Sequence, residues 1–201
     1  MVTVTECTTL GKGRLRFHLD NGTELVLYQG EAKQFRMREG STLSDEEEHQ
    51  LIYEVVGKRA KRRTMHLLEQ MDRTEQQLRD KLKQGGYPQA CIDLALEYVK
   101  SFHYVDDYRC ACTYINYRQD RMSRYQLKVK LYGKGVSGEL VDRALEECYE
   151  GDEQDQIIRL LEKKKFDAQN SDQKEFTRVY QYLMRRGFRS NDVLRAMKSK
   201  Q

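Results

Sequence analysis

A glycine with the same pattern of apolar residues on both sides occurs three times along the chain. The three copies, Gly86, Gly135 and Gly187, stand about 50 residues apart, a period typical of helical repeat proteins. Apolar residues lie four and eight positions before each glycine, and six and ten positions after it. This spacing indicates two short amphipathic helices, and the glycine between them supplies the left-handed residue that ends the first helix.

The first helix of each pair also has a recognisable start. In the first two copies a hydroxyl residue is followed three positions later by glutamine, which is the spacing of a capping box. These pairs are Thr74 with Gln77 and Ser123 with Gln126. The third copy has Glu175 where the cap would stand, so its cap is expected earlier, at Ser171 or Asp172.

A longer helix precedes each pair, and these helices are expected over residues 58–71, 107–119 and 153–165. Three helices per unit and three units in tandem predict a mainly α-helical repeat protein, elongated and curved, whose units stack on their neighbours. The expected organisation is an N-terminal β-hairpin segment at 1–43, followed by repeats at 44–105, 106–150 and 151–201.

Residues 15–28 predict the hairpin. Asn21-Gly22 is a favoured two-residue turn, because both residues tolerate a positive φ. With this turn, Phe17 lies opposite Val26 and the apolar side chains gather largely on one face. Because an isolated hairpin is only marginally stable, we expect it to need a third strand or a partner surface.

The helical part is expected to begin at Ser44, which has a capping-box partner in Glu47. Gly57 is expected to weaken or end this first helix, because glycine is a poor helix former. The basic run at 58–63 follows, and such a run is usually a solvated helix face rather than a nucleic-acid contact.

Residues 104–118 hold two adjacent carboxylates and two cysteines, so they raise the question of a metal or redox site. Asp106 and Asp107 fit the start of a helix, where an N-cap and a further carboxylate are favourable. Cys112 falls on the apolar stripe of that helix, and Cys110 lies beside the stripe. The chain has no C-x-x-C and no paired histidines at helical spacing, so we expect a helix start and no metal site.

Other chemical motifs are missing as well. The sequence contains neither of the glycine-rich nucleotide-binding loops, no nucleophile elbow and no H-E-x-x-H helix. We therefore expect a protein that is not an enzyme and that uses no cofactor.

The net charge of +4 is unevenly distributed, since residues 1–57 are net acidic and the remainder is net basic. A basic body favours a polyanion or an acidic protein surface as partner; the alternative interpretation is that helices rich in both signs serve only to keep the protein in solution. No apolar run approaches the ~20 residues that span a bilayer, and the N-terminus lacks the order of a signal peptide. We expect a cytoplasmic protein without membrane contact, with its five cysteines reduced.

Residues 58–148 contain a series of short motifs. They are Arg73 and Thr74 at the cap, the pairs QL (77–78) and KL (81–82), the glycine–aromatic turn GY (86–87), and DDYRCA at 106–111. In these motifs the chain resembles the RecX family, regulators of the RecA recombinase. The run QLKVKLYGKGVSGELVDRALEE fits the second repeat of that family. Two departures are Cys110, where the family has phenylalanine, and Gln77, where it has glutamate. The third unit and the hairpin fit by architecture only.

The resemblance implies a protein that binds RecA and its DNA filament and inhibits recombinase and ATPase activity, in recombination, DNA repair and the SOS response. The candidate contacts are basic residues expected to face away from the core. They are Arg73, Arg79, Lys83, Arg109, Arg118, Arg121, Arg124, Lys128 and Lys134.

The alternative is a helix-turn-helix-like protein that acts directly on nucleic acid, because a short helix, a glycine turn and a second helix also describe that motif. The second helices, PQACIDLALEY and SGELVDRALEE, carry more acid than base. Such helices are poor readers of a major groove, so the RecA partner is preferred, with at most weak direct DNA binding.

Overall fold

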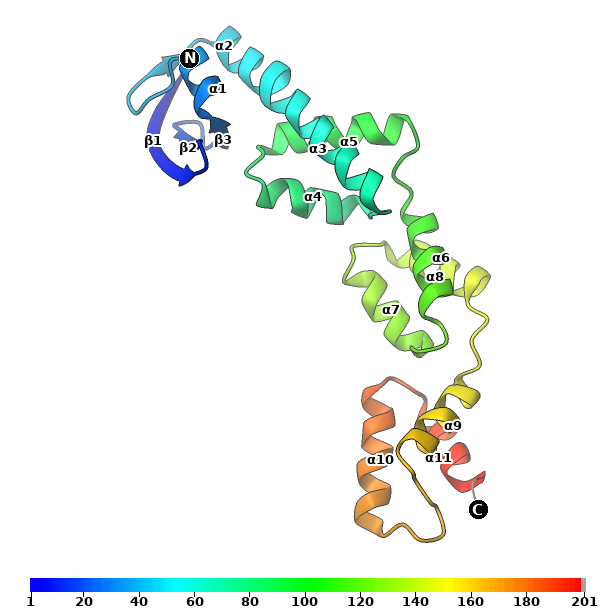
Figure 1. The fold of residues 1–201 in the computed structure, drawn as a ribbon. Helices are drawn as coiled ribbons and strands as arrows, with labels where there is room; N and C mark the ends of the chain where they lie inside the picture. Colours follow the sequence, from blue (N-terminus) through cyan, green and yellow to red (C-terminus); the bar gives the residue numbers. More distant parts are fainter. Residues whose placement is uncertain (200–201) are drawn as a thin grey trace. The chain divides into compact units, whose positions relative to one another are not determined.

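The structure, a computed structural model, describes residues 1–199 of the chain. The chain forms two compact units, Met1–Asp106 and Asp107–Gln201. Most described residues are helical, and the strands all lie within the first 43 residues of this part (Figure 1). The predicted mainly α fold of tandem three-helix repeats behind a small β segment is confirmed.

The β segment is a four-stranded antiparallel sheet. Its strands are β1 (Val2–Gly11), β2 (Arg14–Leu19), β3 (Glu24–Tyr28) and β4 (Thr42–Leu43), in the spatial order β3-β2-β1-β4. Strands β2 and β3 form the expected hairpin, and β1 and β4 extend it. The sheet therefore has more strands than the single hairpin that the turn signal predicted.

The predicted register of the hairpin is wrong by one residue. Phe17 pairs with Leu25, not with Val26. The turn contains three residues, and in it Gly22 has a positive φ of 81° whereas Asn21 does not. This is a type I turn followed by a left-handed glycine, a common alternative to the two-residue turn. The observed register places two fully buried side chains, Phe17 and Leu25, on the same face.

A continuous helical segment follows the sheet. It runs through α2 (Asp45–His49), the π-helical η1 (Gln50–Val56) and α3 (Gly57–Gln70), whereas the short α1 (Gln29–Gln34) lies between β3 and β4. Ser44 and Glu47 form the expected capping box at its start.

Gly57 does not end this helix, contrary to the prediction. A Cβ at this position would lie 2.7 Å from Leu94 Cδ2, on a neighbouring helix. Gly57 therefore serves close packing between helices, a role that a glycine in a helical pattern does not reveal without its neighbours.

The first three-helix bundle consists of α3, α4 (Glu75–Gln84) and α5 (Gln89–Ser101). It shares one hydrophobic core with the sheet, which includes Phe17 and Leu25 from the strands and Leu78 and Leu96 from the helices. The turn between α4 and α5 also meets the sheet edge, because the backbone N–H of Val26 donates to the carbonyl of Gly86 at 3.1 Å. Sheet and first bundle thus form one folding unit.

The second unit contains two bundles with separate cores. The second bundle consists of α6 (Asp107–Arg118), α7 (Arg124–Tyr132) and α8 (Gly138–Cys148). The third consists of α9 (Glu153–Lys163), α10 (Gln173–Arg185) and α11 (Ser190–Ser199).

The repeated turn has the same geometry in all three bundles. The φ angles of its glycines are 75° at Gly86, 80° at Gly135 and 78° at Gly187. Thr74 and Ser123 cap α4 and α7, each accepting a hydrogen bond from the backbone N–H three residues ahead. The third bundle uses Asp172 in the same way. The apolar spacing and the cap residues thus correspond to real helix ends.

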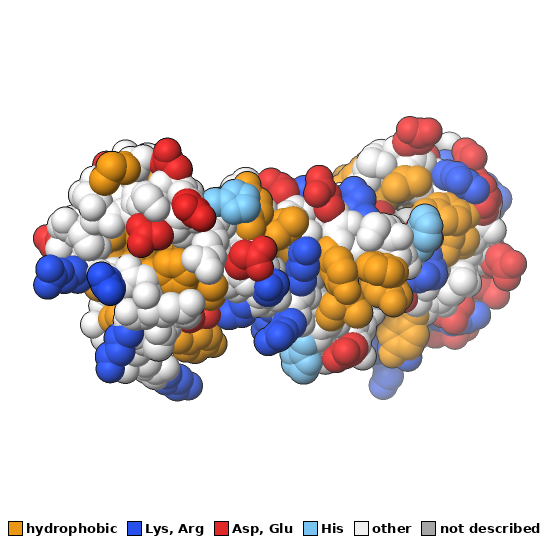
Figure 2. Space-filling view, turned by 90° about the horizontal axis from the view of Figure 1, so that it is seen from above, with side chains coloured by type: hydrophobic (Ala, Val, Ile, Leu, Met, Phe, Trp, Pro, Cys, Tyr) orange, Lys and Arg blue, Asp and Glu red, His pale blue; other side chains and the backbone are white. Residues whose placement is uncertain are grey.

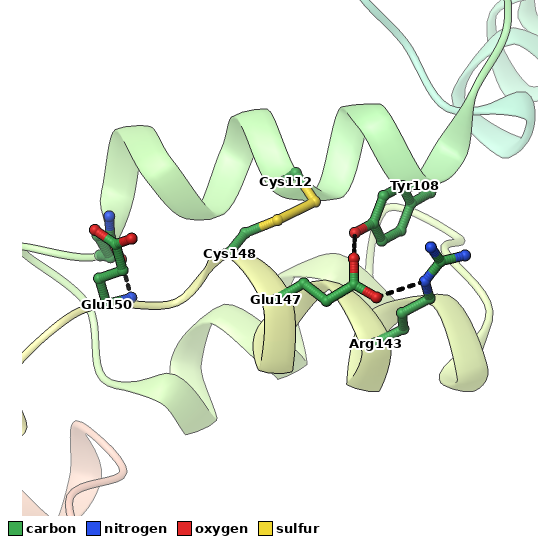
Figure 3. Close-up of a disulfide and its surroundings, with 7 residues drawn as sticks. Tyr108, Cys112, Arg143, Glu147, Cys148 and Glu150 are labelled. Carbon is green, nitrogen blue, oxygen red and sulfur yellow. Dashed lines mark hydrogen bonds and ion pairs between the residues drawn. A yellow bond between two sulfur atoms is a disulfide. The ribbon is translucent and has the colours of Figure 1, made fainter.

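A disulfide joins Cys112 of α6 to Cys148 at the end of α8 (Figure 3). The expectation that all five cysteines are reduced is therefore wrong for this pair. The two helices pack together, and the Cα atoms of the two cysteines lie 5.6 Å apart, within the span that a disulfide bridges. The pairing depends on this packing of α6 against α8, which residue spacing along the chain does not give.

Candidate functional site

The candidate site is a set of basic side chains on the helical bundles, and in the first bundle these side chains mostly serve the fold. Arg79 binds Glu75 at 2.9 Å and Asp93 at 2.6 Å, which ties α4 to α5. Its hydrogen bond lowers the pKa of Asp93. Arg73 donates to a backbone carbonyl of α3 at 3.4 Å. Lys83 is exposed on α4, so it is the predicted residue of this bundle that lies open to solvent.

In the second bundle the predicted residues differ in what surrounds them. Lys128 of α7 pairs with Asp142 of α8, and this hydrogen bond raises the pKa of Lys128. Three others lie over tyrosine rings: Arg118 over Tyr117, Arg124 over Tyr149 and Lys134 over Tyr114. Arg109 is exposed on α6. A ring leaves the charge of the cation in place, as for Arg118 and Arg124, whereas the Lys128 pair is locally neutral.

The same bundle is braced by polar contacts around its disulfide. The Tyr108 hydroxyl donates to Glu147, and Arg143 Nε donates to the same carboxylate at 2.9 Å (Figure 3). The bond from Tyr108, followed by the one from Arg143, lowers the pKa of Glu147. The motif at 106–111 therefore begins a helix that is fastened to α8, in keeping with a structural role.

Arg121 is a predicted residue that lines a pocket together with several other cations. The pocket has a volume of about 460 Å³ and lies within the second unit, where the second and third bundles meet. Its lining residues are Asp120, Arg121, Gln156, Arg159, Leu160, Lys163, Tyr182 and Arg186. We call it the seam pocket. The sequence predictions missed Arg159, Lys163 and Arg186, although the four-residue spacing of the first two on α9 was a readable signal of a shared helix face.

Two buried polar side chains fix the seam between these bundles. The Ser123 hydroxyl, fully buried, donates to the carbonyl of Arg186 at 2.7 Å while it caps α7. Gln156 Nε2 donates to the carbonyl of Gln119 at 2.6 Å. Ser123, predicted as a helix cap, thus also positions the turn of the third repeat.

The surface offers charge for binding. On the face drawn in Figure 2, Lys and Arg side chains are interspersed with Asp and Glu side chains and with apolar patches. Among the described residues, no three His, Cys, Asp or Glu side chains are grouped so as to hold a metal ion. Within that same part of the chain, no helix is long and apolar enough to cross a membrane.

The fold defines a class, that of proteins built from tandem three-helix domains. Residues 60–98 match the family model described as the first three-helix domain of RecX, and residues 151–197 match the third. The chain belongs to the RecX family. The match at 151–197 extends the sequence resemblance to the third unit, which had fitted by architecture only.

Relatives named "Regulatory protein RecX" extend over most of the chain. That of Caldanaerobacter subterraneus subsp. tengcongensis is 28% identical over 163 residues, which cover 80% of this chain and 80% of the relative. That of Geobacillus kaustophilus is 32% identical over 168 residues, 82% of this chain and 62% of the relative.

Two crystal structures share the fold. A regulatory protein RecX superposes with a TM-score of 0.63 at 20% identity, covering 96% of this chain and 97% of its own. RecX from Lactobacillus salivarius superposes with a TM-score of 0.62 at 16% identity, covering 72% and 96%.

Proposed function

We propose that this protein is a non-enzymatic regulator that binds the RecA recombinase on its DNA filament and inhibits its ATPase and recombinase activity. Membership of a family whose members are named regulatory proteins is the observation that carries the proposal. In this role the protein would act in recombination, DNA repair and the SOS response, in the cytoplasm and without a cofactor.

The charge distribution supports a filament as partner. A RecA filament on DNA presents phosphates together with protein surface, and cations that are not neutralised within the chain can bind the phosphates. Among the nine predicted contacts, Arg79 and Lys128 are neutralised by carboxylates of neighbouring helices. The contact is therefore better assigned to exposed cations such as Lys83 and Arg124.

The test measures RecA-dependent ATP hydrolysis on single-stranded DNA, with increasing amounts of the protein, at two ionic strengths. We expect suppression that weakens with salt, because counterions compete for the same contacts. Charge reversal by Lys83→Glu with Arg124→Glu should weaken the suppression. The matched control, Lys174→Glu with Arg178→Glu on α10, changes the net charge equally at exposed positions and should retain it.

Equal suppression by the variant, the control and the parent would remove these two residues from the interface. Absence of any effect on RecA would refute the proposed function. If that absence came with tight, salt-sensitive binding to naked duplex DNA, the helix-turn-helix-like alternative would replace it.

A further inference from the structure

The seam pocket carries an excess of positive charge. Four cations line it, Arg121, Arg159, Lys163 and Arg186, against one carboxylate, Asp120. Within the described part of the chain, Arg159 approaches a carboxylate of its own helix at 3.7 Å, and the other three cations form no ion pair. Like charges held this close repel each other, so an anion in the pocket would relieve the repulsion.

An uncharged ring holds part of this charge in place. The guanidinium of Arg186 lies 4.9 Å from the centre of the Tyr182 ring, and the ammonium of Lys164 lies 4.6 Å from it. A ring attracts a cation through its quadrupole without cancelling the net charge. By contrast, the carboxylates bound to Arg79 neutralise it. The cations at Tyr182 are therefore positioned and still available to an anion.

A buried acceptor in the same pocket lacks a partner. Gln156 is 5% exposed, and its Nε2 is committed to the carbonyl of Gln119. Its Oε1 has no hydrogen-bond partner among the described residues. An unsatisfied buried acceptor is costly, so a bound group with a donor beside its anion would satisfy it. A sugar hydroxyl or a base amino group next to a phosphate has this character.

We propose that the seam pocket is a phosphate-binding site, taking the phosphate of a nucleic-acid strand or of a free nucleotide. Guanidinium groups bind phosphate oxygens through paired hydrogen bonds. Arg121 comes from the α6–α7 connection and Arg186 from the end of α10, two segments that the Ser123 bond joins, whereas Arg159 and Lys163 come from α9. A volume of about 460 Å³ is that of a small-molecule site, large enough for a nucleotide unit. As a contact for filament DNA the site rests on the proposed function, but phosphate binding itself needs no RecA.

The test compares three full-length proteins: the parent, a pocket variant (Arg159→Ala with Lys163→Ala) and a control variant (Lys174→Ala with Arg178→Ala). All four positions are exposed on helices of the third bundle, so folding should be retained. Two probes are used, a fluorescent oligothymidylate followed by anisotropy, and pyrophosphate followed by calorimetry.

We expect the pocket variant to bind at least one probe about tenfold more weakly than the parent, while the control changes by less than about twofold. For the oligonucleotide, losing two phosphate contacts should reduce the slope of log K against log salt by about 1.4. A second variant, Tyr182→Leu, should also weaken binding, because it releases two cations without changing the net charge.

Each outcome decides the matter. Loss of oligonucleotide binding alone assigns the site to a strand phosphate, and loss of pyrophosphate binding alone assigns it to a free nucleotide. Unchanged binding of both probes by the pocket variant, or equal losses in pocket and control variants, would overturn the proposal. Normal probe binding by the parent without any effect on RecA would refute the proposed function while the phosphate site stands.

Discussion

Replacing Gly86 with alanine tests how the first bundle is seated on the sheet. Gly86 has a φ of 75°, and a Cβ there would lie 2.3 Å from Val26 Cγ2 on the edge strand β3. The left-handed conformation of an alanine at this position would cost about 1–2 kcal/mol of stability. The contact would cost about 1–3 kcal/mol more, as overpacking of a formed core does. We expect Gly86→Ala to lower the free energy of unfolding by about 2–5 kcal/mol.

The matched control is Gly22→Ala in the hairpin turn. Gly22 has a φ of 81°, but nothing lies within 4 Å of the Cβ that alanine would add. This variant should therefore lose only the backbone part, about 1–2 kcal/mol. Both glycines belong to the unit Met1–Asp106, so the two variants report on the same unfolding transition.

Urea unfolding of the full chain, followed by circular dichroism, gives the two free energies. A double variant, Gly86→Ala with Val26→Ala, removes the clashing methyl and should recover part of the loss, a coupling of about 1–2 kcal/mol. Equal destabilisation of Gly86→Ala and Gly22→Ala, with no coupling between Gly86→Ala and Val26→Ala, would show that the added Cβ does not clash with Val26.

Three further predictions concern single groups. Replacing both Cys112 and Cys148 with serine should destabilise the second bundle by about 4 kcal/mol, because the disulfide closes a sequence separation of 36 residues. An unfolding midpoint that does not respond to the double substitution, or to reductant on the parent, would contradict this. Burial raises the pKa of the Cys91 thiol to about 12, so iodoacetamide at pH 8 should label it only after unfolding, as mass spectrometry would show. The hydrogen bond from Lys100, helped by the one from Arg79, lowers the pKa of Glu75 although burial opposes this shift. Its stabilising contribution is thus present above pH about 4.5 and lost as the pH falls through its folded pKa, so Glu75→Gln should flatten the acid side of the stability profile.

Local signals made the helical repeats predictable. The glycine of each turn and the capping residues Thr74 and Ser123 act on backbone within a few positions, so their effect can be read from a short stretch of sequence. The hairpin turn was also found, but its register was not. Two- and three-residue loops share the Asn21-Gly22 signal, and the choice between them depends on burying Leu25 against Phe17.

Features that depend on distant residues escaped sequence reasoning. Gly57 was expected to break a helix, whereas its role is to admit Leu94 from another helix. Cys112 was correctly placed on an apolar face, but its partner Cys148 came from the packing of α6 on α8. The sequence shows which residues are basic but not which of them are neutralised. Only the structure shows that Arg79 is neutralised by neighbouring carboxylates.

The seam pocket belongs to a pair of bundles rather than to either repeat. Arg121 comes from the second bundle's α6–α7 connection, whereas Arg159 and Lys163 come from α9 of the third. The Ser123 hydroxyl fixes the seam, since it caps α7 and donates to the carbonyl of Arg186. Ser123→Ala would leave the partly buried Arg186 carbonyl without this donor and loosen the seam, although every cation would remain. Phosphate binding should therefore weaken in Ser123→Ala even though its net charge equals that of the parent. A site made only of surface charge would not respond to this change.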